Sequence, residues 1–143
     1  MKTYVVAATS LIKAAVAARQ HAYAPYSKFK VGAALMTVDG RVFTGCNIEN
    51  ASYGATICAE RVALFKAVSE GCTEFATIAV VYDRDELATP CGICRQALAE
   101  FGGNITVIHA NLRGECECSR VSDLLPRSFS LKKQQKQSRR RAG

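Results

Sequence analysis

Three cysteines and one glutamate have the types and the spacing of a metal site with a proton-transfer group beside it. Cys91 and Cys94 form a Cys-x-x-Cys motif directly after Pro90, and Cys58 stands upstream with Glu60 two residues later. Two thiolates of one helical turn can converge on a zinc ion, and a third sulfur from another element leaves the fourth tetrahedral position open for water. This pattern therefore favours a catalytic over a structural zinc ion.

Glu60 is the group that we expect to move protons at this site. Because it lies two residues beyond a ligand, it can approach the metal without binding it. A carboxylate beside a zinc-activated water can accept its proton and pass it to a substrate atom. A structural zinc site has no use for such an acid, which strengthens the catalytic interpretation.

The charge of three thiolates exceeds that of one Zn²⁺ ion and weakens the pull of the metal on water. Arg61 directly follows Glu60, three residues after Cys58, and Arg95 directly follows Cys94. We expect at least one of them to donate hydrogen bonds to a ligand sulfur and to offset this charge.

The cysteine pattern leaves other interpretations open. A Cys-x-x-Cys motif is also typical of redox-active sites and of four-ligand structural zinc sites, for which Cys116 or Cys118 is the candidate fourth ligand. A disulfide scaffold is disfavoured, because the seven cysteines are an odd number and no secretory signal is visible. Cys46 and Cys72 are interpreted as small buried hydrophobic residues, and His109 as a structural residue on an apolar strand.

The hydrophobic pattern predicts alternating helices and strands that position these residues. The expected helices cover residues 5–22, 58–70 and 90–101, with a last helical turn at 121–125; the expected strands cover 31–37, 41–46, 76–82, 105–110 and 115–119. Both cysteine groups then lie at helix starts, where the helix dipole favours thiolate. This order predicts an α/β fold, a three-layer α/β/α sandwich with a mixed central sheet.

The length and composition are those of one globular domain. The 143 residues are 49% hydrophobic and 22% charged, and no apolar run approaches the roughly 20 residues of a membrane span. We expect a cytoplasmic protein without membrane contact, because the N-terminus has no secretory signal pattern. The catalytic domain is expected to cover residues 1–130, followed by a basic, mobile tail at 131–143.

The formal net charge of +7 comes almost entirely from that tail. Six basic residues follow Leu131 and no acidic residue follows Asp123, so the body of the chain is nearly neutral. Proteins that act on polynucleotides need a basic groove with stacking aromatic side chains, and this chain has no tryptophan. Nucleic acid is therefore not an expected partner.

Several segments resemble the zinc-dependent cytidine deaminases of the small homotetrameric type. The segments are residues 26–34, 45–53, 58–61, 90–96 and 124–126 with Phe129, and the resemblance covers residues 4–130. It implies a homotetrameric hydrolase that converts cytidine and deoxycytidine to uridine and deoxyuridine in pyrimidine salvage. By the same resemblance, Cys58, Cys91 and Cys94 hold Zn²⁺ while Glu60 carries protons from water to the pyrimidine ring and to the departing amine.

The resemblance also implies the contacts with the substrate. Asn47 and Glu49 match the pair that reads the ribose hydroxyls, for which an amide and a carboxylate offer a donor and an acceptor. Phe29 matches the residue that packs against the nucleoside, and the backbone around Ala59 meets the base carbonyl.

Two rival functions use the same cysteine set. A deaminase of an aminonucleoside antibiotic of the blasticidin type shares the ligands and the acid, but residues 47–50 suit ribose and favour cytidine. A structural zinc module without catalysis is the other rival, and it has no role for Glu60.

Overall fold

The computed structural model describes residues 2–132 and 140–142, which contain a five-stranded mixed sheet. Its strands are β1 (Val31–Thr37), β2 (Val42–Cys46), β3 (Phe75–Tyr82), β4 (Thr106–Ala110) and β5 (Cys116–Arg120). They lie in the order β2-β1-β3-β4-β5, with β3 and β4 parallel and the other neighbours antiparallel. The turn between β1 and β2 contains Gly40, whose φ of 90° favours glycine.

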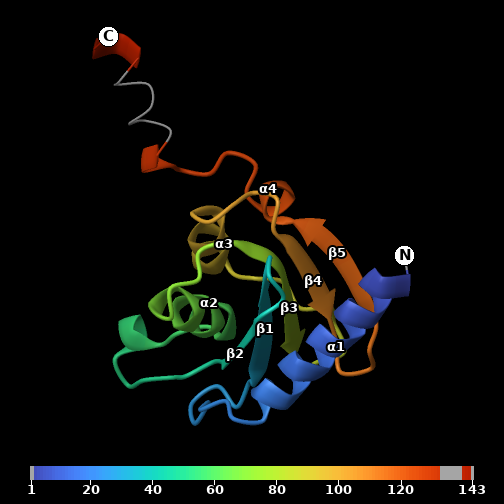
Figure 1. Cartoon of the computed structure of the whole chain (residues 1–143). Helices are drawn as coiled ribbons and strands as arrows, with labels where there is room; N and C mark the ends of the chain where they lie inside the picture. The colour runs from blue at the N-terminus through green and yellow to red at the C-terminus, as the bar shows by residue number, and fades with distance from the viewer. Residues whose placement is uncertain (1, 133–139, 143) are drawn as a thin grey trace.

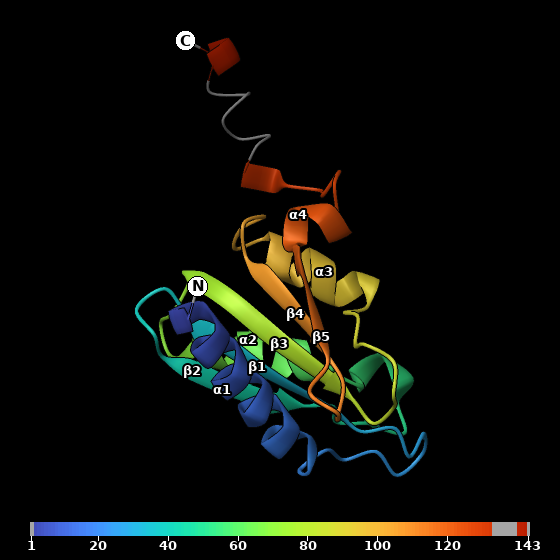
Figure 2. The same cartoon turned by 90° about the vertical axis from the view of Figure 1, so that its right-hand side faces the viewer.

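Helices cover both faces of this sheet (Figures 1 and 2). One face packs against α1 (Lys2–Arg19), whereas the other packs against α2 (Ala59–Ser69), α3 (Gly92–Ala99) and α4 (Val121–Leu124). A short 3₁₀ helix (Tyr53–Ala55) precedes α2. The α/β/α sandwich with a mixed central sheet, predicted from the sequence, is therefore confirmed.

Side chains of β1 alternate between the two layers of the core. Ala33 and Leu35 belong to the apolar cluster that includes α2 and α3, while Ala34 belongs to the cluster around α1. Successive side chains of a strand point to opposite faces, so one strand serves both layers. Burial of a side chain such as Leu35 stabilises the fold by about 1.5–3 kcal/mol.

Two glycines let the helices approach the sheet closely. A Cβ atom added at Gly32 would lie 2.0 Å from the carbonyl oxygen of Ala15 in α1, and one at Gly45 would lie 2.4 Å from that of Ala59 in α2. Both distances are far inside van der Waals contact, so the helix backbone would have to move. Gly45 therefore sets the height of the start of α2 above the sheet, and with it the position of Cys58.

The helix boundaries differ from the prediction in ways that local structure explains. α1 ends at Arg19 rather than at residue 22, because Gln20, His21 and Ala22 donate hydrogen bonds to carbonyls three residues back rather than four. α3 starts later than the expected residue 90, because Cys91 is its extended N-cap residue. It ends at Ala99 rather than at residue 101, where the N–H of Phe101 donates to the carbonyl of Leu98 three residues back.

The domain boundary expected at residue 130 remains a prediction. The expected mobile tail covers residues 131–143, of which 133–139 and 143 lie outside the described residues. At the start of this tail, Lys132 Nζ lies 3.7 Å from Glu100 Oε1. Within the described ranges, no helix is long and apolar enough to cross a membrane.

Candidate active site

The starts of α2 and α3 bring three cysteine sulfurs together. Cys58 and Cys91 are the extended N-cap residues of α2 and α3, and Cys94 lies in the first turn of α3. All three sulfur atoms lie within 4.8 Å of one another, and the Sγ atoms of Cys58 and Cys91 are 3.7 Å apart. In residues 2–132 and 140–142, no other group of three or more His, Cys, Asp or Glu side chains converges in this way.

The sulfur spacing fits a zinc ion. Zn–S bonds of about 2.3 Å in tetrahedral geometry place two ligand sulfurs about 3.8 Å apart. The distance between the sulfurs of Cys58 and Cys91 is close to that value. Cys116 and Cys118, the candidate fourth ligands, lie on β5 and line a separate cavity beside α1, so the four-cysteine alternative is wrong.

The interaction between the thiols of Cys58 and Cys94 shifts their pKa values in opposite directions. Hydrogen bonds from the Cys94 thiol and from Arg61 lower the pKa of Cys58 to about 5. The same interaction with Cys58, together with burial, raises the pKa of Cys94. One thiolate therefore forms readily at the start of α2, where the positive end of the helix dipole also favours an anion.

Arg61 and Arg95, both expected beside the sulfurs, have different partners. Arg61 Nη2 donates to Cys58 Sγ at 3.6 Å. Arg95 donates to the carbonyl oxygen of Pro90 at 2.8 Å and to that of Leu124 at 3.0 Å. Arg61 thus makes the expected hydrogen bond to a sulfur, while Arg95 ties the segment before α3 to α4.

Glu60 lies in the first turn of α2 with its side chain inside the protein. It is 3% exposed, and burial, with the negative charge of Cys58 as a further cause, raises the pKa of Glu60 to about 7. A carboxyl group whose pKa is near neutrality can accept a proton and release it again within one catalytic cycle. Its position beside three converging sulfurs suits acid-base chemistry at a metal.

A cavity of about 300 Å³ opens onto these groups, and Cys58, Cys91 and Glu60 line it. The lining also includes every residue expected to contact the substrate: Phe29, Asn47, Glu49 and Ala59. The sulfur cluster and the expected substrate contacts therefore share one space. A volume near 300 Å³ is at the lower end of the range typical of small-molecule sites.

Asn47 uses both ends of its amide on the backbone that leads into β1. Its Oδ1 accepts a hydrogen bond from the N–H of Val31 at 2.8 Å, and its Nδ2 donates to the carbonyl oxygen of Phe29 at 2.7 Å. Asn47 therefore fixes the backbone of Phe29, and one amide N–H remains for another partner.

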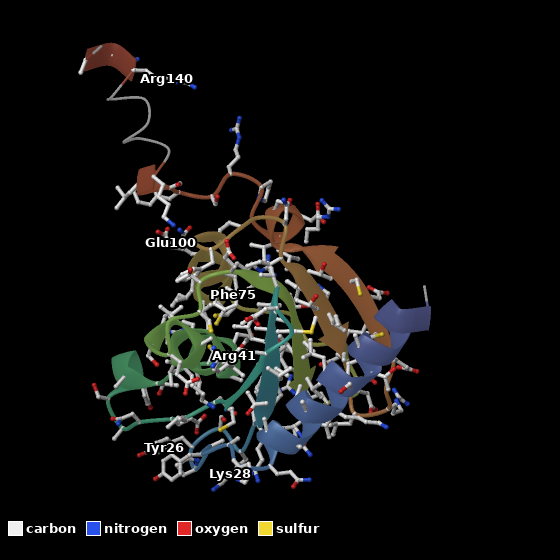
Figure 3. All side chains as sticks on the ribbon, viewed as in Figure 1. Tyr26, Lys28, Arg41, Phe75, Glu100 and Arg140 are labelled. Carbon is white, nitrogen blue, oxygen red and sulfur yellow. The ribbon has the colours of Figure 1, made fainter. Side chains whose placement is uncertain are left out.

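Glu49 binds the loop before β1 in a similar way. Its Oε1 accepts hydrogen bonds from the N–H groups of Tyr26 and Ser27 at 3.0 and 3.1 Å (Figure 3 labels Tyr26). Hydrogen bonds from Ser27 lower the pKa of Glu49, so its carboxylate is charged at neutral pH. The second carboxylate oxygen can accept from a ligand.

The sequence did not predict the two side chains that hold Phe29 in place, Tyr82 and Arg84. Tyr82 lines the same cavity, and its ring meets the ring of Phe29 edge-on with 5.2 Å between centroids. The guanidinium of Arg84 lies 4.6 Å from the centroid of the Phe29 ring. The sequence feature that could have indicated Tyr82 is its position as an aromatic residue at the end of the strand that precedes the Cys-x-x-Cys motif.

The chain is similar to known deaminases over most of its length. Residues 6–110 match the family model described as the cytidine and deoxycytidylate deaminase zinc-binding region. The chain belongs to this family. It is 52% identical to the cytidine deaminase of Sporosarcina psychrophila over 121 residues, which cover 84% of this chain and 89% of that relative.

Solved structures agree with this membership. The crystal structure of cytidine deaminase from Burkholderia pseudomallei matches with a TM-score of 0.81 and 54% identity, and the match covers 84% of this chain and 97% of that one. A blasticidin-S deaminase from Bacillus cereus is more distant, with 30% identity over 112 residues that cover 73% of this chain and 79% of that relative. Family membership confirms zinc as the cofactor and an enzyme, a hydrolase of the cytidine deaminase family, as the kind of protein.

Proposed function

We propose that this protein catalyses the hydrolytic deamination of cytidine and deoxycytidine to uridine and deoxyuridine, a reaction of pyrimidine salvage. One observation carries the proposal: the buried carboxyl of Glu60 and three converging cysteine sulfurs lie beside a cavity of about 300 Å³. Relatives that are about half identical and carry the name cytidine deaminase support cytidine as the substrate.

Cys58, Cys91 and Cys94 hold the zinc ion in this proposal. When bound, zinc supplies an activated water as the nucleophile for C4 of the pyrimidine ring. Three thiolates around a divalent ion carry a net negative charge, which weakens that activation. The guanidinium of Arg61 donates to the Cys58 sulfur and offsets part of this charge.

Glu60 moves the protons of the reaction. Its carboxylate accepts a proton from the attacking water and delivers it to N3 of the ring. It then accepts the second proton of that water from the hydroxyl group formed on C4 and delivers it to the amino group, which leaves as ammonia while the C4 carbonyl forms. One water is consumed and one ammonia is released for each nucleoside, so the atoms balance. A pKa of about 7 lets the carboxyl of Glu60 work in both directions.

The nucleoside is held by the segments on either side of the first hairpin. Phe29 packs against the nucleoside, and Asn47 and Glu49 read the ribose hydroxyls with the hydrogen-bonding capacity that their backbone contacts leave free. Ala59 is the buried first residue of α2, where backbone N–H groups have no partner within the helix. The backbone there can donate to the carbonyl group of the base.

The finer features belong to the same proposal. We infer a homotetramer in the cytoplasm, with the catalytic domain at residues 1–130 and the basic tail at 131–143. Large apolar side chains that are exposed in the single chain, such as Tyr53 at 84% and Phe129 at 62%, support burial against other copies. Analytical ultracentrifugation should show four chains per particle, and a monomer would contradict the assembly.

Ammonia release from cytidine, measured on protein whose zinc content is determined in the same sample, tests the proposed reaction. We expect turnover by protein that carries about one catalytic zinc per chain. No turnover by zinc-loaded protein, or faster turnover of blasticidin S than of cytidine, would overturn the substrate assignment.

A further inference from the structure

Tyr82 attaches the segment that leads into Cys91 to the wall of the cavity. It is the last residue of β3 and lines the cavity, and its hydroxyl donates a hydrogen bond to the carbonyl oxygen of Thr89. Burial raises the pKa of Tyr82 above its ordinary value of 10, so the hydroxyl is protonated at neutral pH. Thr89 lies two residues before Cys91, one of the proposed zinc ligands.

The next carbonyl of the same segment also has a side-chain partner. Arg95 Nε donates to the carbonyl oxygen of Pro90 at 2.8 Å. Two consecutive carbonyls before Cys91 are therefore held, one by Tyr82 on the sheet and one by Arg95 on α3. With both bonds made, the backbone has little freedom at the point where this cysteine enters the helix.

The ring of Tyr82 makes a second contact, with another side chain that lines the cavity. It meets the ring of Phe29 at 65° with 5.2 Å between centroids, while the guanidinium of Arg84 lies 4.6 Å from the Phe29 centroid. Edge-to-face aromatic pairs and cation–π contacts both favour particular ring orientations. The orientation of Phe29 thus depends on Tyr82 and Arg84.

We propose that Tyr82 is a positioning residue that couples the metal-binding segment to the wall that holds the nucleoside. Its hydroxyl fixes Thr89 and, through it, Cys91, whereas its ring fixes Phe29. The inference rests on the proposed function, because that function assigns Cys91 to zinc and Phe29 to the nucleoside. The hydroxyl of Tyr82 therefore affects zinc binding and its ring affects nucleoside binding, and the two effects can be measured separately.

Tyr82→Phe and Tyr82→Leu separate these effects. Tyr82→Phe keeps the ring and removes one hydrogen bond, so zinc release to a chelator should become about three to ten times faster. Its KM for cytidine should stay within about twofold of the wild-type value, because the aromatic pair with Phe29 persists. Tyr82→Leu loses the ring as well, and its KM should rise by about three- to tenfold.

Tyr23→Phe is the matched control, because it removes the hydroxyl of a tyrosine that is 57% exposed. Its zinc release and KM should equal those of the wild type, and thermal unfolding of each variant verifies the fold. Zinc release from Tyr82→Phe at the wild-type rate, equal acceleration in Tyr23→Phe, or an unchanged KM in Tyr82→Leu would overturn the proposal. Zinc release needs no turnover, so a zinc-loaded protein that leaves cytidine intact would refute the proposed function and still give a release rate.

Discussion

Two groups of cysteines on this chain have opposite settings. Cys58, Cys91 and Cys94 converge within 4.8 Å where two helices begin. Cys116 and Cys118 lie exposed on β5, one of the two edge strands of the sheet. The two groups look alike as short cysteine motifs, yet the first alone draws its members from two separate elements.

The two groups of cysteines differ in how the backbone around them stabilises a thiolate. A helix start has N–H groups without helical partners and the positive end of a dipole. On β5, Cys116 and Cys118 sit in register with Ala110 and Ile108 of β4 within an antiparallel ladder. Arg61 adds a donor only to the helical group. A thiol motif therefore becomes a metal site through the elements that carry it, rather than through its spacing alone.

Replacing one cysteine in each group has the largest expected effect and tests whether only the cysteines at the helix starts bind zinc. Cys94→Ser removes one of three proposed ligands, and we expect loss of bound zinc and of all measurable deamination. Cys118→Ser should keep both, because its cavity beside α1 is separate from the site. Zinc content and ammonia release measure the outcome, and zinc loss from Cys118→Ser alone would reverse the assignment of the two groups.

Glu60 is a second difference between the two groups of cysteines, because β5 carries no buried acidic side chain. Glu60→Gln keeps the shape and removes the proton carrier, so kcat should fall by about 10²- to 10⁴-fold while zinc stays bound. Glu100→Gln, which changes the C-cap residue of α3, serves as the control and should leave kcat unchanged. A Glu60→Gln enzyme with kcat within tenfold of wild type would remove Glu60 from the chemistry.

Arg61 gives a smaller effect that isolates the charge around the sulfurs. Arg61→Ala removes the donor to Cys58, and zinc affinity should fall by about 10- to 100-fold, as for other partners of metal ligands. Arg113→Ala changes an arginine whose side chain is 60% exposed and should leave the affinity unchanged. Equal affinities for both variants in a competition titration with a chelator would contradict the charge-offset role.

The smallest expected effect concerns the packing that places the start of α2. An added methyl group at Gly45 collides with backbone atoms of Ala59 and Ala63, so Gly45→Ala should lower the free energy of unfolding by about 1–3 kcal/mol. A Cβ at Gly54 meets no atom within 4 Å, so Gly54→Ala is the matched control. Urea unfolding compares the two, and equal stability would mean that α2 can shift without cost.

Much of the fold could be predicted from local patterns. The strand at 31–37 has the expected bounds, because an apolar run is followed directly by the Asp39-Gly40 turn. The end of the first helix could not be predicted, because its last turn tightens into hydrogen bonds to carbonyls three residues back. No local pattern distinguishes the two kinds of turn there.

The site was predictable only where residue type and helix position decide it. The convergence of the three cysteines and the position of Glu60 beside them agree with the expectation, although the roles of these residues remain predictions. The burial of Glu60 is a finding of the structure that the sequence did not predict. The contact of Arg61 with Cys58 is local, because the two residues are three apart at the start of α2. The contact of Arg95 with the carbonyl oxygen of Leu124 depends instead on packing between α3 and α4, which sequence spacing does not encode. The contact of Tyr82 with Thr89 has the same origin, because it depends on how the loop folds back onto β3.

The number of sulfur atoms around the zinc ion decides most directly whether this is a catalytic site. X-ray absorption at the zinc edge of the loaded protein counts the ligands and measures their distances. Three sulfurs at about 2.3 Å and one oxygen or nitrogen at about 2.0–2.1 Å are expected. A shell of four sulfurs would mean a closed structural site and would contradict the catalytic role of the three cysteines.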